Sequence, residues 1–188
     1  MHAIAKQKSP VNSIFEILVG RHHTNFWLQK INPLWSIHQA LGKIIEKNQS
    51  AQDTISLTIE VNRHFKMGQA GQHHPVIVEV NGRCYERTYS LTQLDAHRVL
   101  LTVKKVAEGI VSQWLTETAQ IGDVLEFGQP YGEMLIPKTE QPLILLAAGS
   151  GITPMYSLVK KLAELGHLGQ KSVRLMYWVK KNQDAVFK

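Results

Sequence analysis

The stretch PVIVEVNGRCYERTYSL, Pro75 to Leu91, decides the first part of the fold. Its two halves are short and rich in β-branched and aromatic residues, as strands are. Asn81-Gly82 separates them, and an Asn-Gly pair is the strongest short signal for a two-residue hairpin loop. The stretch therefore predicts two antiparallel strands joined by a tight turn.

Similar runs lie on both sides of this hairpin. Thr54 to Val61 (TISLTIEV) and Arg98 to Val106 (RVLLTVKKV) are β-rich, Ile44-Ile45 precedes them, and VLEFG follows Gly122-Asp123. Several short strands separated by turn signals are typical of a closed antiparallel barrel or a sandwich. The residues alone leave these two architectures open.

The pattern changes after about residue 140. Pro142 to Gly149 (PLILLAAG) is a continuous apolar run, which predicts a parallel strand buried on both faces. Thr153 to Leu165 has helical spacing, with apolar residues on one side, and Val173 to Val179 (VRLMYWV) is a second apolar strand. Strand, glycine-rich turn, helix and strand form a βαβ unit. A full doubly wound sheet needs more strands, so we expect this second domain to be incomplete.

Composition narrows the class of protein. The chain has 188 residues, 44% of them hydrophobic, a formal net charge of +6 and a single cysteine, Cys84. One cysteine excludes an internal disulfide and a cysteine-ligated iron–sulfur cluster, and it fits a reducing cytoplasm. Dispersed positive charge suits acidic or phosphorylated partners, and no basic stripe with aromatics indicates nucleic acid. We expect no secretory signal in residues 1–10 and no membrane span.

The turn AAGSGITP, Ala147 to Pro154, is a candidate phosphate site. Gly149 and Gly151 stand where a buried strand gives way to a helix, and free N–H groups at a helix start attract anions. Thr153 is expected to cap the helix. The alternative is an ordinary strand-to-helix turn, but the strands on either side favour dinucleotide binding.

Two lysines, Lys180 and Lys181, follow the second apolar strand. In dinucleotide folds this position faces the adenine ribose, where a cation accommodates a 2′-phosphate. The pair therefore favours NADPH over NADH, and a solvated basic loop is the alternative.

RTYSLT, Arg87 to Thr92, combines a cation, an aromatic ring and hydroxyl groups. Arg87 can bind a phosphate in bidentate fashion. Tyr89 shares its strand face and offers a flat ring for stacking, whereas Ser90 points the other way in a regular strand. Downstream, Gly109 and Ser112 stand at an expected helix start, which is a further place for a phosphate. On these two residues alone, an ordinary serine near a helix start is the favoured alternative.

Taken together, RTYS, GIVS and AAGSGITP resemble the ferredoxin–NADP⁺ reductase family of flavoenzymes. The resemblance implies a six-stranded antiparallel flavin-binding barrel followed by the start of a Rossmann-like parallel α/β domain. It implies FAD and NADP(H) as cofactors, with Ser90 and Tyr89 at the reacting part of the flavin. The implied flavin contacts are Arg87, Thr88, Tyr89, Ser90, His74, Glu108, Gly109, Ile110, Val111 and Ser112. The implied nicotinamide contacts are Gly149, Ser150, Gly151, Thr153, Lys180 and Lys181.

We therefore predict a helical extension at residues 1–35, an FAD-binding barrel at 36–137 and a partial NAD(P)-binding domain at 138–188. The predicted reaction passes electrons from NADPH through FAD to an iron–sulfur acceptor of the ferredoxin type. Resemblance to reductases that serve fatty-acid desaturases suggests a membrane desaturase further downstream and a cytoplasmic protein at the membrane periphery. The alternatives are a flavin-binding module without reductase turnover and a β-barrel protein-interaction domain. No metal site is predicted.

Overall fold

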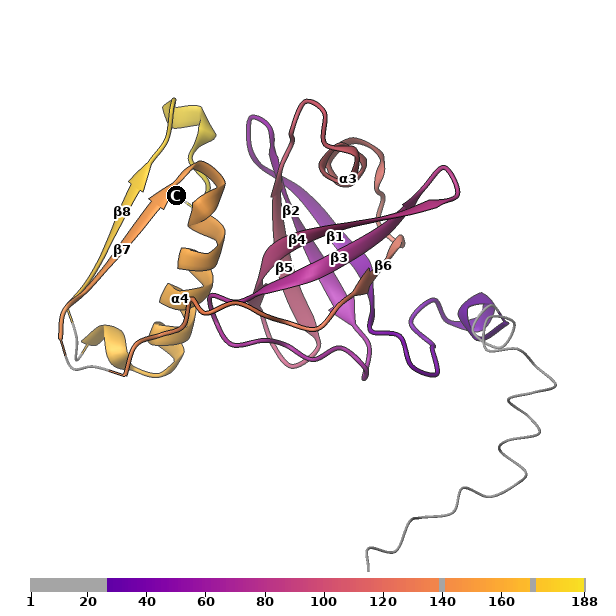
Figure 1. Cartoon of the computed structure of the whole chain (residues 1–188), viewed down its shortest axis with the longest axis horizontal. Helices are drawn as coiled ribbons and strands as arrows, with labels where there is room; N and C mark the ends of the chain where they lie inside the picture. The colour runs from indigo at the N-terminus through magenta and orange to yellow at the C-terminus, as the bar shows by residue number, and fades with distance from the viewer. Residues whose placement is uncertain (1–26, 139–140, 170–171, 188) are drawn as a thin grey trace, which may run out of the picture.

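The structure is a computed structural model that describes residues 27–138, 141–169 and 172–187. It consists of a β-barrel and a smaller α/β unit that lie side by side (Figure 1). Helix α4 of the α/β unit faces the barrel, and the two-stranded sheet lies on the outer side of this helix (Figure 1).

The barrel is closed and antiparallel, with the strand order β1-β2-β5-β4-β3-β6. Pairing of the first strand with the last closes it, with Leu41 opposite Glu126. This topology confirms the six-stranded barrel and removes the sandwich alternative. The strands are β1 (Leu41–Ala51), β2 (Thr54–Val61), β3 (His73–Val80), β4 (Arg83–Gln93), β5 (Arg98–Lys104) and β6 (Val124–Phe127).

The predicted hairpin is the β3–β4 connection. Asn81 and Gly82 have φ values of 53° and 73°, which is the left-handed conformation that a two-residue primed turn requires. The register runs from Val80 opposite Arg83 to His73 opposite Ser90. This register brings the RTYS motif level with the start of β3.

The barrel core is a single apolar cluster. Its fully buried side chains include Ile44, Leu57, Ile59, Leu91, Leu101, Leu115 and Leu125. Leu115 comes from the segment after β5, where α3 (Ile110–Gln113) runs into the π-helical turn η1 (Trp114–Thr118). This segment therefore packs against the barrel core and contributes a side chain to it.

One seam of the barrel is only partly paired. β4 and β5 are joined at Leu91 opposite Leu101, Thr92 opposite Leu100, and Gln93 opposite Val99. Before Leu91, β4 pairs with β3, and after Leu101, β5 pairs with β2. The two strands therefore diverge at Thr88–Ser90 and Thr102–Lys104, and this divergence leaves backbone groups of β4 without a ladder partner on the β5 side.

The α/β unit is the predicted βαβ motif. β7 (Leu143–Ala148) and β8 (Val173–Trp178) are parallel, with Leu143 opposite Val173 and Ala148 opposite Trp178. Between them lie η2 (Gly149–Gly151), α4 (Ile152–Glu164) and η3 (His167–Gly169), and η4 (Asn182–Asp184) follows β8.

Burial of β7 differs from the prediction. The strand alternates, because Leu145 and Ala147 are buried whereas Ile144 and Leu146 are 60% and 58% exposed. The cause is that α4 covers one face of the sheet, and no described element covers the other. The apolar run predicts a strand buried on both faces, but α4 packs against only one face.

The α/β unit contacts the barrel through α4. A Cβ atom on Gly71, which has a φ of 92°, would lie 2.0 Å from the Met134 carbonyl oxygen and 3.1 Å from Leu158 of α4. Glycine therefore permits a close approach of three segments. Further along the helix, the Lys160 ammonium donates to the Gln93 carbonyl at the end of β4.

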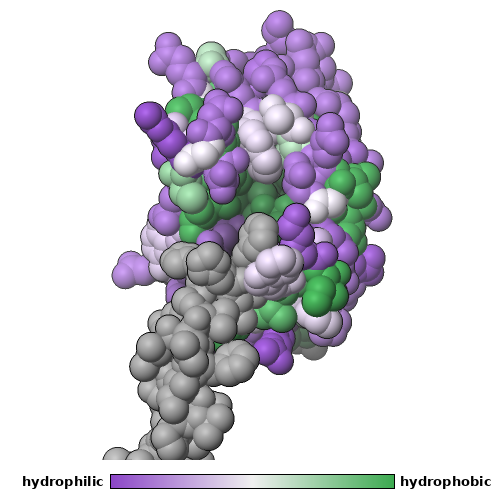
Figure 2. Space-filling view, turned by 90° about the vertical axis from the view of Figure 1, so that its right-hand side faces the viewer, coloured by the Kyte–Doolittle hydropathy of each residue, from purple (hydrophilic) through white to green (hydrophobic). Residues whose placement is uncertain are grey.

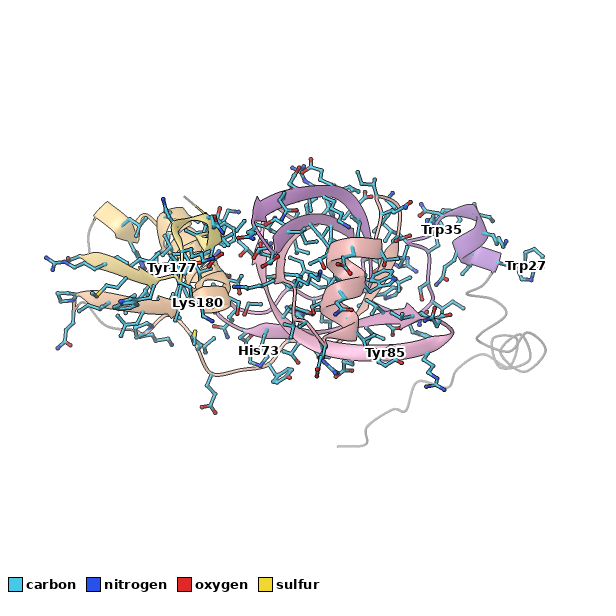
Figure 3. All side chains as sticks on the ribbon, turned by 90° about the horizontal axis from the view of Figure 1, so that it is seen from above. Trp27, Trp35, His73, Tyr85, Tyr177 and Lys180 are labelled. Carbon is cyan, nitrogen blue, oxygen red and sulfur yellow. The ribbon has the colours of Figure 1, made fainter. Side chains whose placement is uncertain are left out.

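The described N-terminal residues form a short helical turn at 27–31. Trp27 and Trp35 lie at the end of the molecule opposite Tyr177 and Lys180 (Figure 3). The barrel end seen in Figure 2 carries apolar residues among many hydrophilic ones. Of the described helices, none has the length and apolar character needed to cross a bilayer.

Candidate flavin and nucleotide site

A cavity of about 500 Å³ lies where the partly paired seam of the barrel meets the α/β unit. Three segments that are far apart in sequence form its walls. From the barrel come Thr88, Tyr89, Ser90, Thr102, Lys104, Lys105, Val106 and Ser112, and from the α/β unit come Ser150, Gly151, Thr153 and Pro154.

The β4 wall carries the aromatic ring and two hydroxyl groups. Tyr89 is half-buried and packs against the barrel core. Burial raises the pKa of its phenol, and the nearby Arg87 charge opposes that shift only in part, so the phenol is neutral at ordinary pH. The Thr88 hydroxyl lies 2.9 Å from the phenol oxygen of Tyr131, which belongs to the linker between β6 and β7 (residues 128–142).

The opposite barrel wall is cationic. Lys104 ends β5 and Lys105 follows it, and both line the cavity. The Lys105 ammonium lies 2.5 Å from the Glu117 carboxylate, and this partner raises the pKa of Lys105. Both lysines line the cavity where a phosphate group would be attracted.

The α/β wall comes from the glycine-rich turn. A Cβ atom on Gly151 would meet nothing within 4 Å, so packing does not require glycine there, but a closely approaching ligand would benefit from it. Gly149 has a φ of 52°, which glycine adopts without strain. Pro154 lies in the first turn of α4, as predicted.

Thr153 does not cap α4. Gly151 occupies the cap position without a side-chain hydrogen bond, and the Thr153 hydroxyl donates to the Ser150 carbonyl at 3.1 Å. The helix begins one residue earlier than expected, at Ile152, which places Thr153 inside the first turn. The prediction of a Thr153 cap was therefore wrong, although this residue does line the cavity.

Ser112 lines the cavity, but its hydroxyl is already engaged. It donates to the Gly109 carbonyl at 3.0 Å and accepts from the Val106 N–H at 3.2 Å. A Cβ atom on Gly109 would lie 2.4 Å from the Ser112 hydroxyl oxygen, so glycine is needed to form this turn. Gly109 and Ser112 thus stabilise the conformation of this loop.

His74 lies away from the cavity. Its side chain is fully buried in the barrel, where it stacks on Phe65 with 5.2 Å between ring centroids. Its Nε2 atom accepts from the Gly68 N–H at 3.2 Å, and burial lowers the pKa of the ring. The structure therefore places His74 in the packing of the barrel, and its flavin contact stays a prediction.

Other predicted contacts also lie outside the cavity wall. Arg87 is exposed and donates to the Glu86 carbonyl at 2.7 Å, while Val111 is buried in the barrel core. Lys180 and Lys181 follow β8 and are exposed, beyond the lining residues. The remaining predicted residues that do not line it are Glu108, Gly109, Ile110 and Gly149.

The sequence reading missed the cationic wall. Lys104, Lys105 and Thr102 were treated as ordinary strand residues, yet all three line the cavity. A usable signal was present, because two adjacent lysines, Lys104 and Lys105, lie five and four residues before Gly109 of the GIVS turn.

These side chains suit a cofactor with an aromatic ring system and phosphate groups. Tyr89 offers a ring, Ser90 and Thr88 offer hydroxyl groups, and the lysine pair offers charge.

Residues 41–136, about half of the chain, match the model of the oxidoreductase FAD-binding domain. The chain belongs to this family. Residues 141–186 match the ferric reductase NAD-binding domain, which agrees with the βαβ unit.

Curated proteins are similar to a large part of this chain. An NADPH oxidoreductase of Mycobacterium tuberculosis is 35% identical over 143 residues, which cover 72% of this chain and 38% of the relative. The toluate 1,2-dioxygenase electron transfer component of Pseudomonas putida is 31% identical over 140 residues, covering 73% and 40%. The chain thus spans about two fifths of the length of these curated relatives.

Solved structures agree on the fold. Phthalate dioxygenase reductase, described as a modular structure for electron transfer from pyridine nucleotides to [2Fe–2S], superposes with a TM-score of 0.65 at 29% identity. The match covers 78% of this chain and 46% of that one. The FAD/NAD-binding domain of nitric oxide dioxygenase from Vibrio cholerae gives 0.71 at 22% identity, covering 80% and 66%.

Proposed function

We propose that the chain is the flavin-binding part of an NAD(P)H-dependent oxidoreductase that delivers electrons to an iron–sulfur acceptor. One observation carries the proposal most directly. The RTYS, GIVS and AAGSGITP segments, separated by tens of residues, converge on one cavity between the barrel and the α/β unit. That convergence is the arrangement that a flavin shared with a nicotinamide donor requires.

Different residues of the cavity wall would contact the ring and the phosphate groups of the flavin. Tyr89 supplies a ring against which the isoalloxazine packs, and Ser90 supplies a hydroxyl group at its reacting edge. Lys104 and Lys105 hold phosphate charge. Arg87 is exposed outside the cavity wall, and it would have to exchange its hydrogen bond to the Glu86 carbonyl for a phosphate. The flavin, when bound, supplies hydride acceptance and one-electron release.

Gly151, Ser150 and Thr153 form the side from which the nicotinamide donor approaches. Lys180 and Lys181 remain our basis for preferring NADPH, through the 2′-phosphate that two cations would accommodate. The electron transfer component of toluate dioxygenase and phthalate dioxygenase reductase support an iron–sulfur acceptor. We further propose that a membrane desaturase is the final electron acceptor and that this protein acts at the membrane periphery.

The test begins with the visible absorption spectrum of the purified chain. The cofactor is released by heat and identified, and NADPH or NADH is then added without oxygen. We expect a yellow protein that yields FAD and is bleached faster by NADPH. A protein that holds FAD but is bleached by neither nucleotide would support a flavin module without turnover. A colourless chain that refuses FAD would favour an interaction domain.

A further inference from the structure

A second cavity lies near the other end of α4. Its volume is about 630 Å³, which falls in the range of small-molecule sites. Its walls come from the loop between β2 and β3, the end of β4, the linker, the second half of α4 and η3. It shares no lining residue with the flavin cavity. In Figure 1 the linker passes beside the lower part of α4, where these segments meet.

One part of this wall is apolar. Ala70 comes from the barrel, Ile136 and Pro137 from the linker, and Leu165 from the end of α4. Met67 adds a flexible thioether side chain that adapts to irregular ligand shapes. A ligand that fills this space must therefore offer an apolar body, since water or a small inorganic ion would leave these side chains uncovered.

Another part of the wall carries excess positive charge. Three lysines line the cavity against one carboxylate, Glu164. Lys160 and Lys161 both face that carboxylate, at 3.7 Å and 3.2 Å. Lys138 differs from them, because in the part of the chain that the structure describes it has no hydrogen-bond or ion-pair partner. One lysine is thus available for an anionic ligand group.

One residue of the wall has a buried polar atom without a partner. The Nδ1 atom of His167, a lining residue, is buried and lacks a hydrogen-bond partner among the described residues. Buried polar atoms without a partner are uncommon in folded proteins, and each one calls for an explanation. Rotation of the imidazole toward the cavity would let a ligand oxygen satisfy this nitrogen, in the tautomer that carries its proton there.

We propose that this cavity binds an organic monocarboxylate. The apolar body lies against Ala70, Ile136 and Leu165, and the carboxylate lies at Lys138 and the Nδ1 atom of His167. A single negative charge fits because Glu164 already faces the other two lysines. Since the walls come from both parts of the molecule, the bound acid also bridges the barrel and the α/β unit.

The test uses octanoate as the probe, with the full chain saturated with FAD, and calorimetry as the readout. 1-Octanol has the same apolar body without the carboxylate, and inorganic phosphate has charge without the body. We expect octanoate to bind one to one and both controls to bind at least about tenfold more weakly, as the loss of a charge-assisted contact predicts. Equal affinity for octanoate and either control would overturn the proposal.

Variants locate the site. Lys138→Gln is expected to weaken octanoate binding about tenfold, because it removes the ammonium group that the carboxylate would contact. Lys43→Gln is the matched control, since Lys43 pairs with Glu60 on the barrel surface, and it should leave the affinity unchanged. His167→Phe keeps a ring of similar size and should also weaken binding. Octanoate binding that is indifferent to both Lys138→Gln and His167→Phe would place the acid elsewhere and refute the assignment.

Discussion

The barrel and the α/β unit bury their apolar residues in different ways. The barrel closes on itself, so Leu57, Leu101 and Leu125 have no exposed surface. The two-stranded sheet is packed by α4 on one face only, and Ile144 and Leu146 on the other face remain largely exposed. The comparison teaches that apolar residues in a short run predict a β-strand. Whether both faces of that strand are buried depends on which helices and strands pack against it.

The largest expected effect breaks the barrel core. Leu101→Ala should lower the free energy of unfolding by about 2–5 kcal/mol, because a fully buried leucine leaves a cavity. Urea unfolding followed by circular dichroism measures the change. Ile144→Ala on the open face of β7 is the matched control, with an expected change of about 0.5 kcal/mol or less. Equal losses would mean that the two regions do not differ as described.

The next effect tests which lysine pair binds the flavin. Lys104→Gln combined with Lys105→Gln should weaken FAD binding by about tenfold to a hundredfold, since charge-assisted contacts are lost from the cavity wall. Quenching of flavin fluorescence gives the affinity. The double variant of Lys180 and Lys181 should leave FAD binding unchanged, because these lysines do not line the cavity. The reverse pattern would move the phosphate site to the α/β unit.

Ser90→Ala separates chemistry from binding. We expect reduction of the flavin by NADPH to slow about tenfold or more, since a hydroxyl group at the reacting edge is lost. FAD affinity should change much less, because the lysine wall is intact. Stopped-flow absorbance measures the rate, and a variant that is reduced at the wild-type rate would remove Ser90 from the reaction.

A smaller effect concerns the pH dependence of the barrel. Burial lowers the pKa of His74 below the ordinary value of 6.5, so the unfolded chain binds a proton that the folded barrel resists. Stability should therefore be complete above pH 6.5 and fall as the pH drops below it, until the folded pKa is reached. His74→Gln should flatten this slope in urea titrations, whereas His97→Gln at the exposed turn should preserve it. A slope that survives His74→Gln would assign it to other groups.

The smallest effect checks the start of α4. Thr153→Ala should cost about 0.5 kcal/mol or less, because its hydroxyl donates to the Ser150 carbonyl and does not cap the helix. Asp95→Ala offers the contrast, since this carboxylate accepts from the N–H groups of His97 and Arg98, both at 2.8 Å. Its loss should lower the midpoint of thermal unfolding more than Thr153→Ala does, because two backbone N–H groups lose their acceptor. Thermal unfolding distinguishes the two, and a larger loss at Thr153 would restore the cap.

Local signals predicted much of the fold. Asn81-Gly82 specified its hairpin because the required backbone conformation is written in two residues. The βαβ unit followed from an apolar run, a glycine-rich turn and helical spacing. The exposed face of β7 could not be predicted in the same way, since burial of a strand is a property of its neighbours in space.

Only part of the candidate site could be predicted, because local motifs identify residues but not the segments that face them in space. The motifs identified Tyr89, Ser90, Gly151 and Thr153, which all line the cavity. Divergence of β4 from β5 brings the lysine wall opposite them, and that divergence is a matter of strand register, which no single motif encodes. His74 shows the converse, because a histidine beside a motif gave no sign that its ring would be enclosed.

Closure of the barrel by β1 and β6 has a consequence for synthesis on the ribosome. The first strand must wait for residues near 124–127 before its outer edge can pair, so the barrel cannot be complete in shorter nascent chains. All six strands of the barrel, however, lie within residues 41–127. Because domains tend to fold from the N-terminus as they emerge, we expect the barrel to form before α4 has been translated and to serve as the surface on which this helix settles.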